Sequence, residues 1–218
     1  PIQGEGGFIA PAPGFLRAIA AWAKTNGIVM VADEVQSGIA RTGQWFASQF
    51  EEGFEPDLIT IAKGVAGGMP ISAVTGRAEI MDSSHPGGIG GTYGGNPVAA
   101  AAAVAVLKQI EAGGVLENAM RIQNILLPRL ENMKSRYPVI GDVRGRGAMI
   151  AIEFVEPGTH NPNAAAVDAV VKFCHQNGVL VLNAGTYGNV IRFLPPLPIS
   201  DAQLNDALDV LEAGLASL

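Results

Sequence analysis

The sequence predicts an α/β fold built around a mostly parallel sheet. Two apolar runs rich in β-branched residues, 27–32 and 58–61, predict buried strands. Over residues 15–25 the apolar side chains recur at helical spacing, and Asn26 with Gly27 ends that helix directly before the first strand. Because helix and strand alternate, we expect neighbouring strands to be parallel and joined by right-handed crossovers.

The rest of the first half continues this pattern. Residues 71–76 form another apolar run and predict a further strand. Asn96 followed by proline is a helix start, so an alanine-rich helix is expected over 98–111. Two consecutive glycines at 113 and 114 interrupt the pattern, and the first domain is therefore expected to comprise residues 1–113.

Residues 114–218 predict a second, small α/β domain. A helical stripe runs from Leu116 to Tyr137, and Pro128 inside it should kink or split the helix unless packing compensates. The other expected elements are strands at 148–154, 179–182 and 190–194, a helix over 163–176, and a last helix capped by Ser200 with Gln203 that continues to Leu218.

Composition and charge exclude several function classes. Of the 218 residues, 48% are hydrophobic and 16% are charged, which suits a well-buried α/β protein. A formal net charge of −6 provides no basic surface for nucleic acid or for an anionic membrane. The single cysteine, Cys174, excludes an internal disulfide and a cysteine-rich metal site, and no metal is expected. Without a signal-peptide pattern or a membrane-spanning apolar run, a cytoplasmic location is expected.

The first candidate site residue is a lysine at the end of a predicted strand. Lys63 follows the run 58–61, and glycines at 64, 67 and 68 come after it. A lysine that a buried strand carries into small, flexible surroundings is a candidate for a desolvated amine that forms a Schiff base. The alternative is an ordinary solvated strand end.

A carboxylate follows the other predicted strand of this pair. Asp33 comes directly after the run 27–32, and ligands of open parallel sheets bind outside the carboxyl ends of the strands. Asp33 and Lys63 are therefore expected along one edge. A salt bridge would explain the pair. Pyridoxal phosphate, however, requires both groups, because an amine holds its aldehyde and an anion keeps its ring nitrogen protonated. Strand alternation points Glu34 to the opposite face, and we expect no catalytic role for it.

Four motifs resemble those of the class III, fold type I aminotransferases, in the same order. They are ADEVQSGIARTG, DLITIAKGVAGGMPISAVTGR, GGTYGGNPVAAAAAVAVL and NVIRFLPPLPIS, and together they extend over nearly the whole chain. The resemblance leans towards the branch that acts on 4-aminobutyrate. It implies pyridoxal 5'-phosphate as cofactor, and transfer of an amino group from 4-aminobutyrate or a similar ω-amino acid to 2-oxoglutarate. Residues 1–113 would then be the C-terminal part of the cofactor-binding large domain.

The resemblance also implies roles for individual residues. Lys63 would hold the cofactor and carry the proton as general base and acid, and Asp33 would keep the ring nitrogen protonated. Gln36 would hydrogen-bond the phenolic oxygen, with Val35 beside it in the cofactor site. Thr92 would reach the phosphate held by the other subunit, which implies a homodimer, or a dimer-based tetramer, with a shared active site.

Two further residues would bind substrate. Arg192 lies in the middle of an apolar strand and needs an anionic partner, because a buried unpaired guanidinium is very costly. A fixed internal salt bridge would satisfy it. The resemblance implies instead that Arg192 binds the substrate carboxylate, and that Glu5 pairs with Arg192 when no such carboxylate is present.

The opening PIQGEGG has no initiator methionine, and the resemblance makes the chain a C-terminal half. The phosphate loop and the aromatic that stacks on the cofactor ring would lie outside it, so the 218 residues alone are expected to be inactive. Two alternatives stay open, another class III enzyme acting on ornithine, acetylornithine or a β-amino acid, and a non-catalytic fragment. A Rossmann dehydrogenase is disfavoured, because no G-x-G-x-x-G follows the first strand.

Overall fold

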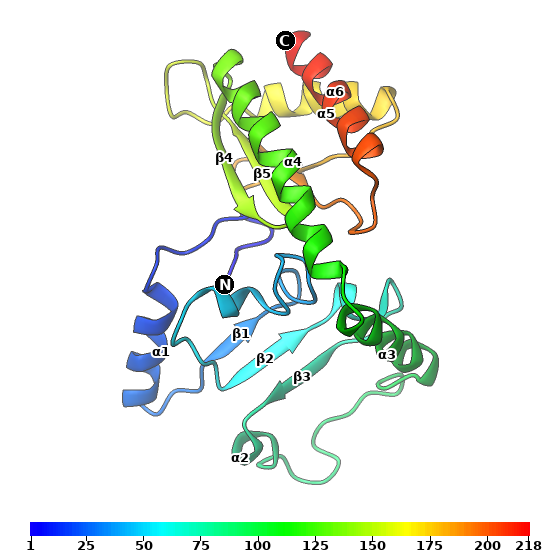
Figure 1. Ribbon diagram of the computed structural model, residues 1–218. Helices are drawn as coiled ribbons and strands as arrows, with labels where there is room; N and C mark the ends of the chain where they lie inside the picture. Colours follow the sequence, from blue (N-terminus) through cyan, green and yellow to red (C-terminus); the bar gives the residue numbers. More distant parts are fainter. The chain divides into compact units, whose positions relative to one another are not determined.

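The computed structural model describes residues 1–218, and the chain divides into two compact units. The first comprises Pro1 with Pro11–Leu116, and the second comprises Ile2–Ala10 with Glu117–Leu218. Figure 1 shows the elements of each in sequence colours. The expected division assigned all of residues 1–113 to one domain. The structure differs because Ile2–Ala10 packs with the second unit, through contacts with two arginines described below.

The sheet of the first unit has the strand order β1-β2-β3 (Figure 1). β1 (Val31–Asp33) and β2 (Leu58–Ile61) are parallel, as predicted, whereas β3 (Ala73–Gly76) pairs antiparallel with β2. The expectation of parallel neighbours is therefore wrong for β3, because the short connection between β2 and β3 contains no crossover helix. β1 also begins later than predicted, since the Met30 N–H donates to the Asp57 side chain (2.8 Å).

Two helices of the first unit, α1 (Phe15–Thr25) and α3 (Pro97–Glu111), lie close to their predicted positions, whereas α2 (Ala78–Met81) was not predicted. The Asn96 side chain accepts the Val98 N–H at 3.0 Å and so caps α3, as its sequence indicates. The 3-10 turns of this unit are η1 (Ala47–Phe50) and η2 (Lys63–Ala66).

The strands of the first unit are less buried than their apolar sequences suggest. Ile28, Val29 and Val31 are each exposed by nearly half (47%, 46% and 45%), and every residue of β3 is exposed. The helix α3 packs against η2 instead of lying along the strands. The prediction of two fully buried strands is therefore wrong for the chain as described.

The sheet of the second unit is antiparallel throughout, with the order β4-β5-β7-β6. The four strands are β4 (Ile140–Arg146), β5 (Met149–Phe154), β6 (Leu182–Ala184) and β7 (Val190–Phe193). β4 was not predicted, because its sequence IGDVRGR lacks an apolar run. β6 begins only at the last residue of the strand predicted for 179–182, since the Val179 N–H still donates to Cys174 O of the preceding helix.

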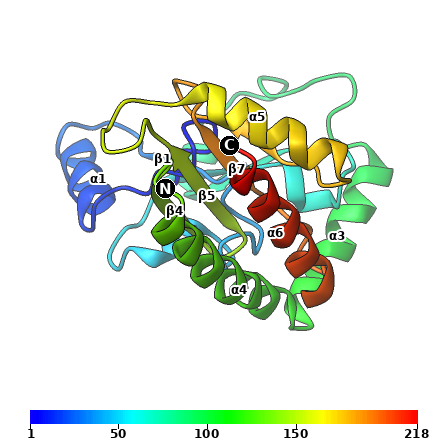
Figure 2. The ribbon, with the colours of Figure 1, turned by 90° about the horizontal axis from the view of Figure 1, so that it is seen from above.

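Three helices cover one face of this sheet, α4 (Val115–Arg136), α5 (Ala164–Gln176) and α6 (Asp201–Ala216) (Figure 2). Their apolar sides form one core with alternate residues of β5, including Ile150 and Ile152. α4 runs unbroken through Pro128, and the fully buried Leu126 and Leu130 on either side of it show the packing that compensates for the proline. The predicted α/β class is confirmed. No single helix has the length and hydropathy of a membrane span, and only the bent pair α3 and α4 reaches these limits jointly.

A row of arginines on α4 pairs with acidic residues on α6. These contacts join two helices that are far apart in the sequence, at the edge of the apolar core. Because most of the partners are partly exposed, each pair is worth at most about 1 kcal/mol in water. The ion pairs are Arg121–Asp201, Arg129–Asp209 and Arg136–Glu212.

Protonation of Glu212 is expected to weaken the native protein at acid pH. The hydrogen bond from Arg136 lowers the pKa of Glu212 below its ordinary 4.5. The folded state therefore binds this proton less tightly than the unfolded chain, and the contribution to stability is present above pH 4.5 and lost as the pH falls through the folded pKa. Urea unfolding across pH should show a shallower acid loss for Glu212→Gln, by less than about 1 kcal/mol. Identical profiles for the two proteins would contradict this origin.

Candidate functional site

Asp33 and Lys63 lie at the same edge of the first unit's sheet. Asp33 ends β1 opposite Thr60 of the parallel strand β2, and Lys63 follows the end of β2. The Glu34 N–H donates to Thr60 O (3.0 Å), which continues the pairing one residue beyond the strand. The carboxylate and the amine are therefore brought to one edge, the arrangement expected from the parallel-strand rule.

The backbone at Lys63 is in the left-handed region, with φ +47°. This conformation costs a residue other than glycine about 1 kcal/mol or more, and such strain is concentrated at functional sites. Gly64 and Gly68 nearby have open space where a side chain would be, so this edge can admit a ligand. The Lys63 side chain is exposed, however. The residues of this chain alone therefore do not supply the desolvation expected for the Lys63 amine.

The Asp33 side chain is oriented by the turn that follows it. Its Oδ1 accepts the Val35 N–H at 3.0 Å, and the carboxylate is exposed at the edge of the sheet. Val35 and Gln36 are both half-buried in the next two positions. The three candidate residues thus belong to one short turn whose geometry Asp33 helps to set.

Glu34 anchors this turn from the inside of the unit. Its carboxylate is fully buried and accepts hydrogen bonds from Ser37 Oγ (2.6 Å) and from the backbone N–H groups of Ala47 (3.0 Å) and Ser48 (2.6 Å). The side chain points away from the exposed Asp33, as strand alternation predicts. No catalytic role was expected for Glu34. In the structure its carboxylate holds the segment 34–48, which carries Gln36.

Replacing Glu34 by glutamine is expected to destabilise the native protein by about 1–3 kcal/mol. The amide nitrogen would face donor groups, so at least one buried N–H, of Ala47 or Ser48, would lose its acceptor. Urea unfolding monitored by fluorescence measures the change. Glu55→Gln is the matched control, because Glu55 is exposed. Equal stability of the two variants would show that the carboxylate of Glu34 does not hold the segment.

Thr92 lies in an exposed segment of the first unit. All residues from 82 to 98 are exposed, including both pairs of glycines that flank Thr92 and Tyr93. A residue that contributes to another subunit's site must be accessible in this way. The structure therefore leaves Thr92 accessible, and its contact with a second subunit stays a prediction.

A second group of candidate residues lies in the second unit, around Arg192 of β7. Its side chain is only 9% exposed, and its Nη1 donates to Glu5 Oε1 at 2.9 Å and to Gly4 O at 3.2 Å. The guanidinium also lies 5.6 Å from the centre of the Phe8 ring. Arg192 Nε is buried without a hydrogen-bond partner. The two residues that were expected to bind substrate thus form an ion pair.

The two members of this ion pair differ strongly in burial. The Glu5 side chain is 76% exposed, and the Glu5 backbone is held by the Gly185 N–H, which donates to Glu5 O at 3.0 Å. A buried guanidinium with an exposed carboxylate partner can exchange that partner for another carboxylate from solution at little cost in packing. A fixed internal salt bridge would bury both groups.

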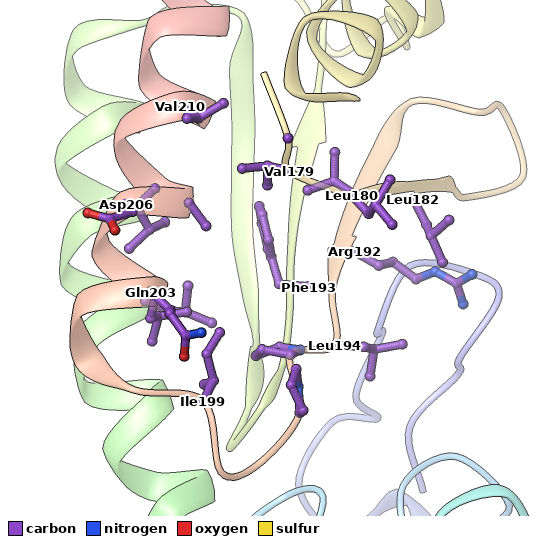
Figure 3. A pocket seen from close by; sticks show the side chains of 18 of the residues that line it. Val179, Leu180, Leu182, Arg192, Phe193, Leu194, Ile199, Gln203, Asp206 and Val210 are labelled. Atoms are coloured by element: carbon purple, nitrogen blue, oxygen red, sulfur yellow. The ribbon is translucent and has the colours of Figure 1, made fainter. Parts of the chain in front are cut away.

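An apolar pocket of about 570 Å³ lies on the other side of β7. Its walls come mainly from the segment 177–182 that leads into β6, from residues 192–196 at the end of β7 and after it, and from α6. They include Leu180, Phe193 and Leu194. Figure 3 shows that the Arg192 guanidinium points away from this pocket towards the N-terminal segment. Arg192 contributes to the lining, but its guanidinium is directed to Glu5, and the other lining side chains are mainly apolar.

Sequence reasoning missed two contributors to the Arg192 site. Phe8 packs against the guanidinium and is almost fully buried, with φ +58°. Arg144 of β4 donates from Nε to Gly7 O at 2.7 Å. Both contacts join residues far apart in the sequence. The sequence offered one signal for the second contact. Arg144 is a charged residue that directly follows Val143, which is buried.

Comparison with known proteins adds the following findings. The family model for Aminotransferase class-III matches residues 1–215. The chain is 53% identical to a 4-aminobutyrate aminotransferase of Mycobacterium tuberculosis, over 100% of the chain and 49% of that relative. It is 46% identical to a 5-aminovalerate aminotransferase of Pseudomonas putida, over 100% of the chain and 51% of that relative. A transaminase structure from the marine bacterium Virgibacillus superposes with a TM-score of 0.92 at 32% identity, over 100% of this chain and 51% of that one. The chain thus spans about half the length of these relatives.

Proposed function

Since this chain belongs to the class-III aminotransferase family, we propose that the full-length protein transfers an amino group from 4-aminobutyrate, or a similar ω-amino acid, to 2-oxoglutarate. The single observation that carries the substrate class is the ion pair between the buried Arg192 and the exposed Glu5. Two similar proteins are named as aminotransferases of 4-aminobutyrate and of 5-aminovalerate, and these names support an ω-amino acid as the amino donor.

The Lys63 and Asp33 side chains at the edge of the first sheet fit pyridoxal phosphate. An amine, from Lys63, suits its aldehyde, and a carboxylate, from Asp33, suits its ring nitrogen. When bound, the cofactor supplies an electron sink for the carbon that loses its proton. Lys63 would hold the cofactor and move that proton as base and acid. Asp33 would hold a proton on the ring nitrogen, and Gln36 and Val35 would complete this side.

Arg192 and Glu5 would let one protein accept two unlike substrates. Glutamate has a carboxylate on the carbon that bears its amine, and Arg192 would bind that group after releasing Glu5. The reacting carbon of 4-aminobutyrate carries only hydrogens, and Glu5 would then neutralise the buried guanidinium. Pairing at every stage matters because a desolvated, unpaired arginine is costly.

We extend the proposal to the assembly. Thr92 on its exposed glycine-rich segment would contact the phosphate bound by a second subunit, so the functional unit would be a homodimer or a dimer-based tetramer, located in the cytoplasm. The 218 residues alone would be inactive, which is supported by their covering only 49% of the tuberculosis relative.

The test is to run each half-reaction alone on the purified full-length protein. Addition of 4-aminobutyrate should change the visible absorbance and release the corresponding aldehyde, and 2-oxoglutarate should then restore the spectrum and yield glutamate. Faster reaction with ornithine, acetylornithine or a β-amino acid would favour another class III activity. A colourless protein that reacts with none of these amines would overturn the proposal.

A further inference from the structure

Residues Ile2–Ala10 form a small hairpin, referred to below as the Glu5 hairpin. Gln3 and Ile9 pair antiparallel, with the Gln3 N–H donating to Ile9 O at 2.9 Å. The Phe8 N–H donates back to Gln3 O, also at 2.9 Å. Glu5 lies at the tip of this hairpin, so its position depends on how the two arms are held.

The hairpin lies on the face of the second sheet that the helices leave uncovered. Arg144, Ala151 and Arg192 are paired across the neighbouring strands β4, β5 and β7, so the three side chains share one face. Their neighbours Ile150 and Ile152 belong to the core under the helices, on the opposite face. Ala151 is completely buried, and its small side chain leaves room for the hairpin between the two arginines.

Each arm of the hairpin is held by a different arginine. Arg192 Nη1 donates to Gly4 O on the outgoing arm, at 3.2 Å. Arg144 Nε donates to Gly7 O on the returning arm, at 2.7 Å. If Arg192 turns to a substrate carboxylate, it gives up its contacts with Gly4 and Glu5. The contact between Arg144 and Gly7 does not depend on that movement.

Arg144 is itself fixed by carboxylates of its own sheet. Its Nη1 donates to Asp142 Oδ2 at 2.9 Å and to Glu153 Oε2 at 2.5 Å, and its side chain is 18% exposed. Glu153 is in turn held by the buried Asn189, whose Nδ2 donates to Glu153 Oε1 at 3.4 Å. Arg144 therefore has two acidic partners within its own sheet, whereas the acidic partner of Arg192 is Glu5 of the hairpin. One nitrogen of each guanidinium, Arg144 Nη2 and Arg192 Nε, is buried without a hydrogen-bond partner.

The fit between Arg144 and the hairpin allows only glycine at position 7. A Cβ added to Gly7 would lie 3.0 Å from Arg144 Nη2 and 3.0 Å from both methyl groups of Val190. Gly7 also has φ +97°, which side chains rarely adopt. By contrast, a Cβ at Gly6 would meet only flexible side chains, of Gln3 and Ile9.

We propose that Arg144 is a positioning residue that keeps the Glu5 hairpin on the sheet while Arg192 is bound to a substrate carboxylate. Glu5 then returns to Arg192 when that carboxylate leaves. This inference rests on the proposed function, because it assigns Arg144 a part in the alternation between the two substrates. It concerns the half-reaction of the amine donor, in which Glu5 must neutralise Arg192.

The test is Arg144→Lys in the full-length enzyme. The ammonium can still pair with Asp142 and Glu153, so the fold should persist, but it cannot also reach Gly7 O. We expect kcat/KM with 4-aminobutyrate to fall about tenfold, the size of one lost hydrogen bond from a charged group, and the value with glutamate to stay within about twofold. Hydrogen exchange at the Gly185 N–H, which donates to Glu5 O, should quicken by a similar factor.

Two controls make the test specific. Arg129→Lys changes an arginine that pairs with Asp209 far from the hairpin, and should leave both half-reactions and the exchange unchanged. Gly7→Ala should reproduce the Arg144→Lys pattern from the side of the hairpin, whereas Gly6→Ala should not.

Each remaining outcome decides one of the two proposals. Unchanged exchange in Arg144→Lys, or an equal fall in both half-reactions, would overturn the positioning role. A wild-type protein that carries out neither half-reaction would overturn the proposed function and with it the catalytic part of the inference. Anchoring of the hairpin would then be decided by the exchange measurement alone.

Discussion

Replacing Lys63 by alanine in the full-length protein is expected to abolish transamination, with a loss of at least about 10⁴-fold in kcat. The variant lacks the amine that would hold the cofactor and the group that would move the substrate proton. Single-turnover measurements with 4-aminobutyrate give the size of the loss. Lys108→Ala, which removes an exposed lysine of α3, is the control and should retain activity. Substantial turnover by Lys63→Ala would contradict the assignment.

The left-handed backbone of Lys63 allows a second comparison at the same position. Lys63→Gly should be as inactive as Lys63→Ala, but more stable by about 1 kcal/mol, because glycine adopts φ +47° without strain. Urea unfolding of the two cofactor-free variants measures the difference. Equal stability would show that the conformation at residue 63 is not strained in solution.

Replacing Arg192 by methionine is expected to separate the two half-reactions. Glutamate would lose the partner of its carboxylate, and its kcat/KM should fall by about 10²–10³-fold, as when one member of a buried charge pair is removed. The donor 4-aminobutyrate does not need that contact, and its half-reaction should fall much less. Rapid-mixing absorbance with each substrate alone measures both effects.

Glu5→Gln should give the opposite pattern. The buried guanidinium of Arg192 would lack a charged partner whenever no substrate carboxylate is bound to it, as when 4-aminobutyrate occupies the site. The donor half-reaction should therefore slow about tenfold, while the glutamate half-reaction is kept. Together, Arg192→Met and Glu5→Gln test whether Arg192 alternates between two partners. Equal effects of either substitution on both half-reactions would contradict an alternation of Arg192 between Glu5 and substrate.

Much of the fold could be predicted because it follows from local patterns. The helical spacing over 15–25 matches α1 (Phe15–Thr25), and the β-branched run 58–61 matches β2. Failures occurred where non-local contacts decide the outcome. β4 is a strand because it pairs with the apolar strand β5, although glycines and charges dominate its own sequence. The exposure of the first unit's strands likewise depends on what packs over them, which periodicity cannot show.

The candidate site divides in the same way. That Asp33 and Lys63 share an edge follows from one rule about parallel strands, and the structure shows that placement. The ion pair of Glu5 with Arg192 was implied by family resemblance, since no local pattern links residues so distant in sequence. The anchoring contacts of Arg144 and Glu34 were not predicted, because they are made to the backbone groups of distant segments.

The measurement that tests the central claim most directly is the location of the cofactor on the full-length protein. The purified native protein is reduced with borohydride, digested, and its peptides are weighed by mass spectrometry. We predict that the peptide containing Lys63 carries the added mass of reduced pyridoxal phosphate, with the modification on the Lys63 amine. Recovery of that peptide unmodified, or modification of a different lysine, would contradict the assignment of Lys63 and the aminotransferase activity built on it.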